Sequence, residues 1–495
     1  MERHGPGRDG SRPSGYQPGA GTISGPSAGA PRARRTETTI DELFLTALTR
    51  IGHEDAYHLW PEGVRDRFRS LVGAATREDP ERTARFLRWL RTETPMRYAA
   101  LAGASAFAAE RLAGGRHGMT RQVVGSVLLR ADDPGHLLAH WLHTYGRAVP
   151  KPVKRGVADA VQRLYDERAL LAYDTGGLHL SIPGPLHTAM TFPDRNGGHR
   201  HLRPLRFGDV IGLVHPAARD ARQADLYRYA LARRRDPRCE VPASLTALSA
   251  VGGRPDRPGW ERLVASMPLG ELVRSLRRLD AAGLPFEAAM AAAARLADPA
   301  EIRAAGLLPL RLAAARSAVA HQRWAPLLER AAGHALGTLP AIPGRTLIVI
   351  DHLGDAGAVL GLTLAQLCAD ANVVTCEGTP FAVLPGESPL HGLHRWRASG
   401  LPPVPVKADG AVRSAFAGHD RVVISGAPLA DLAGIAVPAP VYAWEPEPTW
   451  FAPLTGRVAP VPPPDPDRLV FRGLTDAAYP VIPWIEGARR GAWPF

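Results

Sequence analysis

The chain has 495 residues, 45% of them hydrophobic, which is enough for more than one domain with a buried core. It contains no apolar run long enough to span a membrane and begins with no hydrophobic signal sequence, which argues against a membrane protein and against secretion. The three cysteines, Cys239, Cys368 and Cys376, have neither disulfide-framework nor zinc-finger spacing, so we expect a cytoplasmic protein.

The charge is uneven along the chain. The formal net charge is +12, but residues 341–495 hold 11 basic and 14 acidic residues, a net of −3. Residues 1–340 therefore hold 49 basic and 34 acidic residues, a net of +15. A basic surface in this part indicates a polyanionic partner, and nucleic acid is the obvious one. The alternative is that the many arginines, with abundant alanine, glycine and proline, reflect only a GC-rich genome.

Residues 1–36 are rich in Gly, Pro, Ser and Arg and cannot bury enough apolar surface to fold, so we predict a disordered basic tail. It either adds non-specific RNA affinity or is inert. Residues 37–340 show one helical pattern after another, with Asp-Pro helix starts at Asp79, Asp133 and Asp298. No exact repeat length is apparent, so we predict a degenerate helical solenoid.

The stretch from Lys151 to His215 is the best candidate for binding. The first half, residues 151–174, is predicted to be a basic amphipathic helix with Val153, Val157, Val161 and Leu164 on its apolar face, and a second short helix is expected from Phe207 to His215. Cations at the start of a helix oppose its dipole, which favours an external anion such as phosphate. The alternative is a solvated face. The candidate RNA-binding residues are Lys151, Lys154, Arg155, Arg163, Arg203, Arg206 and His215.

Three histidines, His136, His140 and His143, fall on one face of a predicted helix with a spacing that zinc could use. No HExxH motif, cysteine or nearby carboxylate completes a ligand set. Partly buried histidines, or histidines near RNA, are the commoner case, so we favour that interpretation over zinc.

From about Ala341 the pattern changes to short apolar strands separated by helices or loops. The predicted strands are Thr346–Ile350, Asn372–Cys376, Arg421–Ser425, Val441–Trp444 and Arg468–Arg472. Buried strands that alternate with crossovers predict a parallel, doubly wound α/β sheet in residues 341–495.

The helical stretch resembles the TROVE domain of the Ro ribonucleoprotein family. The resemblance rests on the segment RLYDER with Tyr165, on Leu171-Ala172-Tyr173, and on a helix that ends in His215-Pro216. It covers residues 37–340 and implies an all-α ring of HEAT-like helical repeats. One family histidine that contacts RNA is Phe207 here, so that contact is not carried over.

Residues 341–495 resemble the von Willebrand factor A domain that follows the ring in Ro proteins. That family holds a divalent cation with an Asp-x-Ser-x-Ser loop plus a later Thr and Asp. Here Leu353 and Asp355 replace the two serines, and Ser425-Gly426 stands where the family has Thr-Asp. A remnant Mg²⁺ site of Asp351, Asp355 and Ser425 is the degenerate alternative; we favour a sheet without its ion.

The resemblance implies a monomeric, non-enzymatic protein that binds small structured non-coding RNAs of the Y-RNA kind on its outer basic face. Ends of misfolded RNA would enter the ring, and a ribonuclease is a candidate partner. The competing hypothesis is a protein-interaction scaffold that has lost its RNA. A hydrolase or ligase is disfavoured because no motif names a nucleophile.

Overall fold

The computed structural model describes residues 38–495 except for 52–56, 58–59, 117, 175–190, 194–198, 202–203, 237–238, 240–256, 320–321, 352–353, 401–407, 427–433 and 446–463. The predicted tail, 1–36, lies outside the described residues. None of the described helices has the length and hydrophobicity that a bilayer crossing requires.

Helices make up the described chain from Thr39 to Leu336, apart from a two-stranded antiparallel ribbon that the sequence did not predict, β1 (Thr191–Pro193) with β2 (His199–His201). The helices before residue 240 are α1 (Thr39–Leu48), α2 (Glu62–Glu78), α3 (Pro80–Thr92), α4 (Arg97–Ala113), α5 (Thr120–Val127), α6 (Asp133–Thr144), α7 (Lys151–Leu164), α8 (Glu167–Tyr173), α10 (Phe207–Val214) and α11 (Ala221–Arg235). Those after it are α13 (Arg257–Ser266), α14 (Leu269–Ala281), α15 (Phe286–Ala297), α16 (Pro299–Ala304), α17 (Pro309–Ala318) and α18 (Ala325–Leu336).

A helix begins at each of the three predicted Asp-Pro pairs, and the predicted Asp cap is confirmed at two of them. Asp79 accepts a hydrogen bond from the backbone N–H of Arg82, and Asp298 accepts one from that of Ala300. The prediction for Asp133 is wrong, because Asp133 is the first residue of α6 rather than its cap. Its carboxylate instead forms ion pairs with Arg91 of α3 and Arg97 of α4, and charged donors bind a carboxylate more strongly than a backbone amide does.

Helices α3, α5 and α7 pack side by side, as do α2, α4 and α6. Several polar contacts within these stacks join residues 35 to 38 positions apart. Examples are Arg121 with Asp159 and the hydroxyl of Tyr98 with the ring of His136. The helices therefore stack with a repeat of about this length. The sequence did not show this length, because the contacts recur at a similar separation but involve different residue types.

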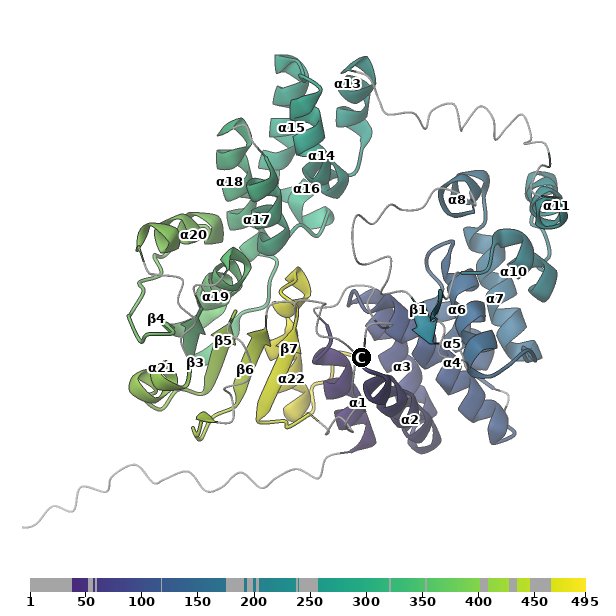
Figure 1. Cartoon of the computed structure of the whole chain (residues 1–495), viewed down its shortest axis with the longest axis horizontal. Coiled ribbons are helices and arrows are strands. Elements are labelled where there is room, and N and C mark those ends of the chain that lie inside the picture. Colours follow the sequence, from purple (N-terminus) through teal and green to yellow (C-terminus); the bar gives the residue numbers. More distant parts are fainter. Residues whose placement is uncertain are drawn as a thin grey trace, which may run out of the picture. The chain divides into compact units, whose positions relative to one another are not determined.

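The predicted parallel sheet is confirmed. Its strands are β3 (Ile342–Ile350), β4 (Cys368–Thr375), β5 (Arg421–Ser425), β6 (Val441–Glu445) and β7 (Arg468–Arg472), in the order β4-β3-β5-β6-β7 (Figure 1). β3 and β4 begin four residues before the predicted starts, because their first residues are paired in the sheet although largely exposed. The helices of this part are α19 (Asp355–Leu367), α20 (Pro389–Ala398), α21 (Ala408–Ala415) and α22 (Val481–Arg489).

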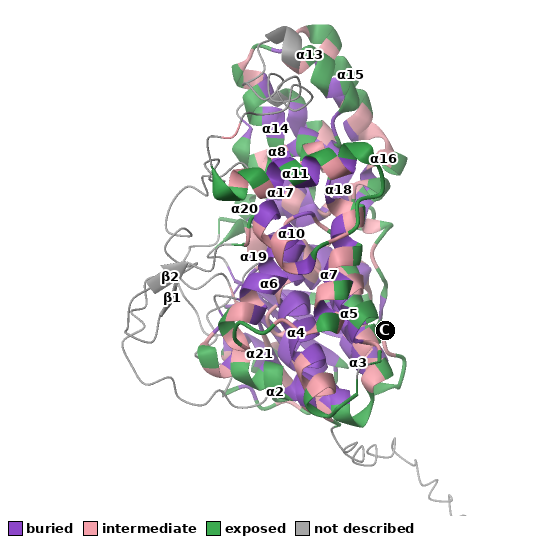
Figure 2. Ribbon diagram, turned by 90° about the vertical axis from the view of Figure 1, so that its right-hand side faces the viewer, coloured by how far each residue is buried: buried purple, intermediate pink, exposed green. Residues whose placement is uncertain are grey.

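The two faces of the sheet belong to different hydrophobic cores. Leu347 and Val349 of β3 point into a small core with α21, whereas Ile348 and Ile350 join the core that runs through the helices. Figure 2 shows the buried residues of the helices gathered between them, with exposed residues along their outer surfaces. The side chains on one face of the sheet thus belong to the same hydrophobic core as the helices, whereas those on the other face do not.

The segment from Trp484 to Phe495 packs against the first helices. Ring centroids lie 5.4 Å apart between Phe44 and Trp493, 5.2 Å between Phe86 and Phe495, and 5.1 Å between Trp89 and Trp484. These distances and the tilted or edge-on geometries are typical of aromatic pairs in protein cores. Helices α1 and α3 therefore complete their packing with residues some 400 positions later in the chain.

Candidate nucleic-acid interface

The predicted helix starts at Lys151 as expected, but it ends at Leu164 and a separate helix, α8, follows from Glu167, because Tyr165 and Asp166 adopt extended conformations. The valines of the predicted face are buried. Val153, Val157 and Val161 are fully buried, whereas Lys151 and Arg155 are exposed and Lys154 is half-buried. Within the described part of the chain, no ion pair involves these three cations, and the first turn of α7 has no acidic residue. The start of α7 therefore presents positive charge together with the backbone N–H groups of a helix N-terminus, a combination that favours phosphate.

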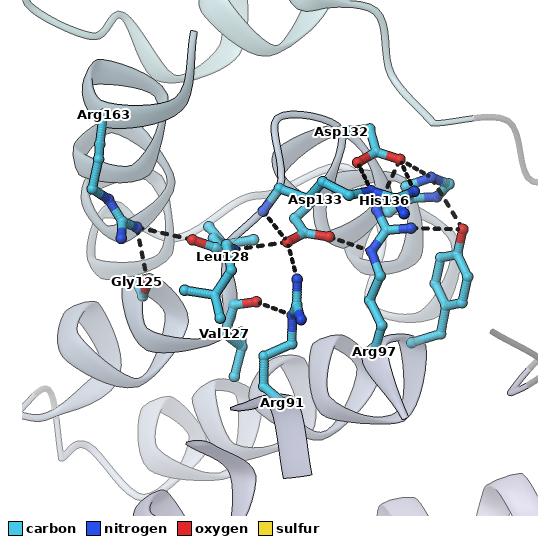
Figure 3. Close-up of polar contacts among 12 residues, drawn as sticks. Arg91, Arg97, Gly125, Val127, Leu128, Asp132, Asp133, His136 and Arg163 are labelled. Carbon is cyan, nitrogen blue, oxygen red and sulfur yellow. Dashed lines mark hydrogen bonds and ion pairs between the residues drawn. The ribbon is translucent and has the colours of Figure 1, made fainter. Parts of the chain in front are cut away.

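Arg163, at the other end of α7, has a structural role. Its Nη2 donates to the carbonyl oxygen of Leu128 at 2.9 Å and to that of Gly125 at 3.4 Å (Figure 3). Both carbonyls lie at the C-terminal end of α5, where helix carbonyls have no partner within their own helix. The guanidinium thus caps α5, a contact that nothing in the local sequence indicates.

Two of the predicted residues, Arg206 and His215, lie at opposite ends of α10. Arg206 precedes the helix and is exposed, and the N–H of Phe207 donates to the Asp174 carboxylate at 2.8 Å. His215 ends the helix in the left-handed conformation, with φ of 50°, and is also exposed. Arg203 lies outside the described residues. Arg206 and His215 thus flank α10 rather than gather at one end of it.

Phe207, which stands where Ro relatives have a histidine, is a core residue. Its ring stacks on that of Tyr165 with centroids 3.7 Å apart and planes 8° apart, and only 2% of its surface is exposed. Burial also raises the pKa of Tyr165 well above its ordinary value. The apolar ring at this position is therefore used for packing.

A buried network of ion pairs, which the sequence did not reveal, lies between α3, α4 and α6 (Figure 3). The carboxylate of Asp133 is fully buried and accepts from Arg97, from Arg91 at 2.9 Å, and from the N–H groups of Leu129 and Arg130. Four donors for one carboxylate satisfy its charge inside the protein. These residues are 36 and 42 positions apart, so only the stacking of the helices brings them together.

The neighbouring Asp132 is held by three partners. Burial alone would raise the pKa of Asp132, but hydrogen bonds from Arg130 and His136 and the charge of Arg97 hold it well below its usual range. Figure 3 shows Asp132 between His136 and Arg97. Asp132 is therefore ionised and fixes the guanidinium of Arg130, to which both of its oxygens bind at 2.7 Å.

The three histidines of α6 have different surroundings. His136 contacts Asp132 at 3.5 Å and packs edge-on against Tyr98, whereas His140 packs edge-on against Tyr57. His143 is exposed. Among the described residues, no group of three or more His, Cys, Asp or Glu is placed to hold a metal ion. Two of the three are thus packed against tyrosines, and the zinc alternative gains no support.

The residues of the remnant cation site have protein partners. Asp355 forms a bidentate pair with Arg397, with one bond of 2.9 Å, and the hydroxyl of Ser425 donates to the carbonyl of Gly357 at 2.7 Å. Asp351 is buried at the end of β3. This donor set fits Mg²⁺ poorly, since one carboxylate is neutralised by an arginine and the hydroxyl proton is directed at a carbonyl. A remnant site at these residues stays a prediction.

The fold is similar to that of a solved Ro protein. The crystal structure of the Deinococcus radiodurans Ro (RSR) protein superposes with a TM-score of 0.57 at 15% identity, covering 91% of this chain and all of that one. The chain has the fold of a Ro protein. Residues 341–495 make up about a third of the chain, so a match of this extent includes both the helices and the sheet. No family model and no curated protein matches the sequence.

Proposed function

We propose that this protein binds RNA in the manner of the Ro family. The observation that carries the proposal is the Ro fold along 91% of the chain, combined with a net charge of +15 in residues 1–340. In finer detail, we propose that it binds small structured non-coding RNAs and the ends of misfolded RNA. It would act as a monomeric tether or chaperone without catalysing bond cleavage, and a ribonuclease is its candidate partner.

The phosphate backbone is the natural ligand of the cations at the start of α7. Lys151, Lys154 and Arg155 supply charge there, and α3, which packs against α5, carries the exposed Arg85 and Arg88. Contacts of this kind recognise the shape of an RNA duplex, because its deep major groove hides the base edges. We therefore expect affinity to depend strongly on salt and weakly on sequence.

The test is a charge reversal of Lys151, Lys154 and Arg155 to Glu. We expect RNA binding at about 150 mM salt to be lost while the circular dichroism spectrum and melting temperature stay unchanged. The matched control reverses Arg274, Arg277 and Arg278, three exposed arginines of α14, and changes the total charge by the same amount. Retained affinity in the first variant, or an equal loss in the control, would contradict the placement on α7.

The second candidate function is a protein-interaction scaffold without RNA. The buried Phe207 in place of the family histidine favours it. Purification from the native host without nuclease treatment, followed by crosslinking and RNA sequencing, separates the two. One enriched small structured RNA supports the Ro function, whereas a nucleic-acid-free protein with one reproducible protein partner supports the scaffold.

A further inference from the structure

Tyr173, the last residue of α8, exposes an aromatic ring beside a cation. Its side chain is 44% exposed, and the guanidinium carbon of Arg130 lies 5.5 Å from its ring centroid. Exposed aromatic rings and arginine planes are the surfaces on which unpaired bases stack. The pair therefore has the chemistry of a nucleobase site.

Arg130 is held rigidly in this position. Its Nε and Nη2 each donate to Asp132 at 2.7 Å, and Asp132 is itself paired with the buried Arg97 at 2.9 Å. The side chain of Asp132 is only 12% exposed, so this support lies inside the protein. A guanidinium that is oriented beforehand loses little conformational entropy when a ligand stacks beside it.

A second cation lies close to the pair. The N–H of Leu205 donates to the carbonyl of Gly135 in α6, at 3.2 Å, and the carboxylate of Asp174, next to Tyr173, accepts from the N–H of Phe207. Arg206 lies between these two anchored residues and is exposed. Its charge also acts on Asp174, although burial is the main reason that the pKa of Asp174 is raised. Arg206 is thus one residue from a backbone contact with Asp174, the neighbour of Tyr173.

We propose that Tyr173 and Arg130 form a stacking site for one unpaired RNA base, with Arg206 contacting the adjoining phosphate. This rests on the proposed function and deepens it, because it assigns single-stranded RNA to residues other than those of α7. A ring and a guanidinium plane accept any base, so the site does not select sequence. It distinguishes an unpaired strand from a duplex, whose bases are already stacked on one another.

The test measures fluorescence anisotropy of the full chain with a labelled oligouridylate of about 12 nucleotides and with a blunt RNA duplex of similar length. We expect Tyr173→Ala to weaken binding of the oligouridylate about tenfold and to leave duplex binding unchanged. Tyr173→Phe, which keeps the ring, should stay within about twofold. The matched control is Phe286→Ala, which removes an aromatic ring that is 79% exposed on α15.

Salt dependence separates the roles of the two side chains. Tyr173→Ala removes no charge and should leave the salt dependence of oligouridylate binding unchanged. Arg206→Ala should lower the slope of log affinity against log salt by about 0.7. Arg130→Lys keeps the charge but loses the planar guanidinium, so it should weaken oligouridylate binding without changing that slope.

The outcomes distinguish failure of the stacking site from failure of the proposed RNA-binding function. If the unaltered protein binds RNA but Tyr173→Ala binds oligouridylate as well as Phe286→Ala does, the stacking site is wrong and the proposed function stands. An equal loss for duplex and oligouridylate, or a loss in Tyr173→Phe as large as in Tyr173→Ala, also overturns it. If the unaltered protein binds neither RNA, the proposed function fails and the stacking site fails with it.

Discussion

Arg155 and Arg163 lie on the same helix, yet they do different work. Arg163 donates to the end carbonyls of α5, whereas Arg155 is exposed and belongs to no ion pair within the described residues. A sequence reader sees two arginines eight positions apart in a basic helix. Only the position of α5 separates a helix cap from a candidate phosphate contact.

We therefore predict that alanine substitution of these two arginines affects different properties, stability for Arg163 and RNA binding for Arg155. Arg163→Ala should lower the free energy of unfolding by about 1 kcal/mol, because the carbonyls of α5 lose their donor. Arg155→Ala should change it by less than about 0.5 kcal/mol and weaken RNA binding instead. Urea unfolding and RNA titration of both variants check this; a stability loss in Arg155→Ala matching that in Arg163→Ala would contradict it.

The buried histidines of α6 predict a loss of stability in mild acid. Burial lowers the pKa of His140 to about 4 and also lowers the pKa of His136. Both are therefore neutral in the folded protein at pH values where the unfolded chain, with an ordinary pKa of about 6.5, already binds protons. Their contribution to stability is fully present above about pH 6.5 and is lost as the pH falls through the folded-state pKa values.

For His140, the unfolding free energy should fall by up to about 1.4 kcal/mol for each unit by which the pH drops between 6.5 and 4.5. His140→Gln should reduce this slope, since glutamine does not titrate. Urea unfolding at several pH values measures it. An unchanged slope in His140→Gln would show that the burial of this ring does not control its protonation.

At the scale of elements, α5 and α7 lie close together at Gly156. A Cβ there would lie 2.7 Å from the carbonyl oxygen of Arg121 and 3.0 Å from Val124. Since the backbone oxygen cannot move without shifting α5, only glycine permits this spacing.

Gly156→Ala should destabilise the protein by about 1–3 kcal/mol, because the two helices must separate. Gly410→Ala in α21 is the control: a Cβ there meets nothing within 4 Å, so this change should stabilise by about 0.5–1 kcal/mol through helix propensity alone. Thermal melting of both variants gives the comparison. Equal melting temperatures would mean that α5 adjusts at no cost.

Elements with strong local patterns were predictable from the sequence. The bounds of β5 and β7 and the start of α7 match the predictions, because apolar runs and amphipathic spacing define them locally. The candidate site was only partly predictable. The cations of α7 were found, but the cap made by Arg163 and the stacking of Arg130 on Tyr173 depend on which helices lie side by side. Asp133 is a further example. Its local sequence predicts a helix cap, but its carboxylate pairs with two arginines that are distant in the sequence.

At the scale of the whole chain, the aromatic segment from Trp484 to Phe495 joins the last helix to the first ones. A further contact is made by the N–H of Arg472, the last residue of β7, which donates to the carbonyl oxygen of Thr49 at 3.4 Å. The α/β part is thus attached to α1 and α3 by aromatic packing and by backbone contact.

Trp493→Ala combined with Phe495→Ala should lower the free energy of unfolding by about 2–4 kcal/mol, less than for fully buried rings because both side chains are half-buried. Phe286→Ala, which removes an exposed ring, should change it by less than about 0.5 kcal/mol. Urea unfolding followed by circular dichroism measures both. If the double variant were as stable as the Phe286 variant, these rings would not hold the first helices.

The same aromatic cluster constrains how the protein is made. Phe44, Phe86 and Trp89 leave the ribosome about 400 residues before Trp484, Trp493 and Phe495. At roughly 5–20 residues per second, that interval lasts on the order of 20 to 80 s. Throughout it the first helices carry an apolar surface whose partners do not yet exist. The N-terminal helices of the nascent chain therefore expose a hydrophobic surface during most of translation. We expect chaperones that act on ribosome-bound chains to bind this surface.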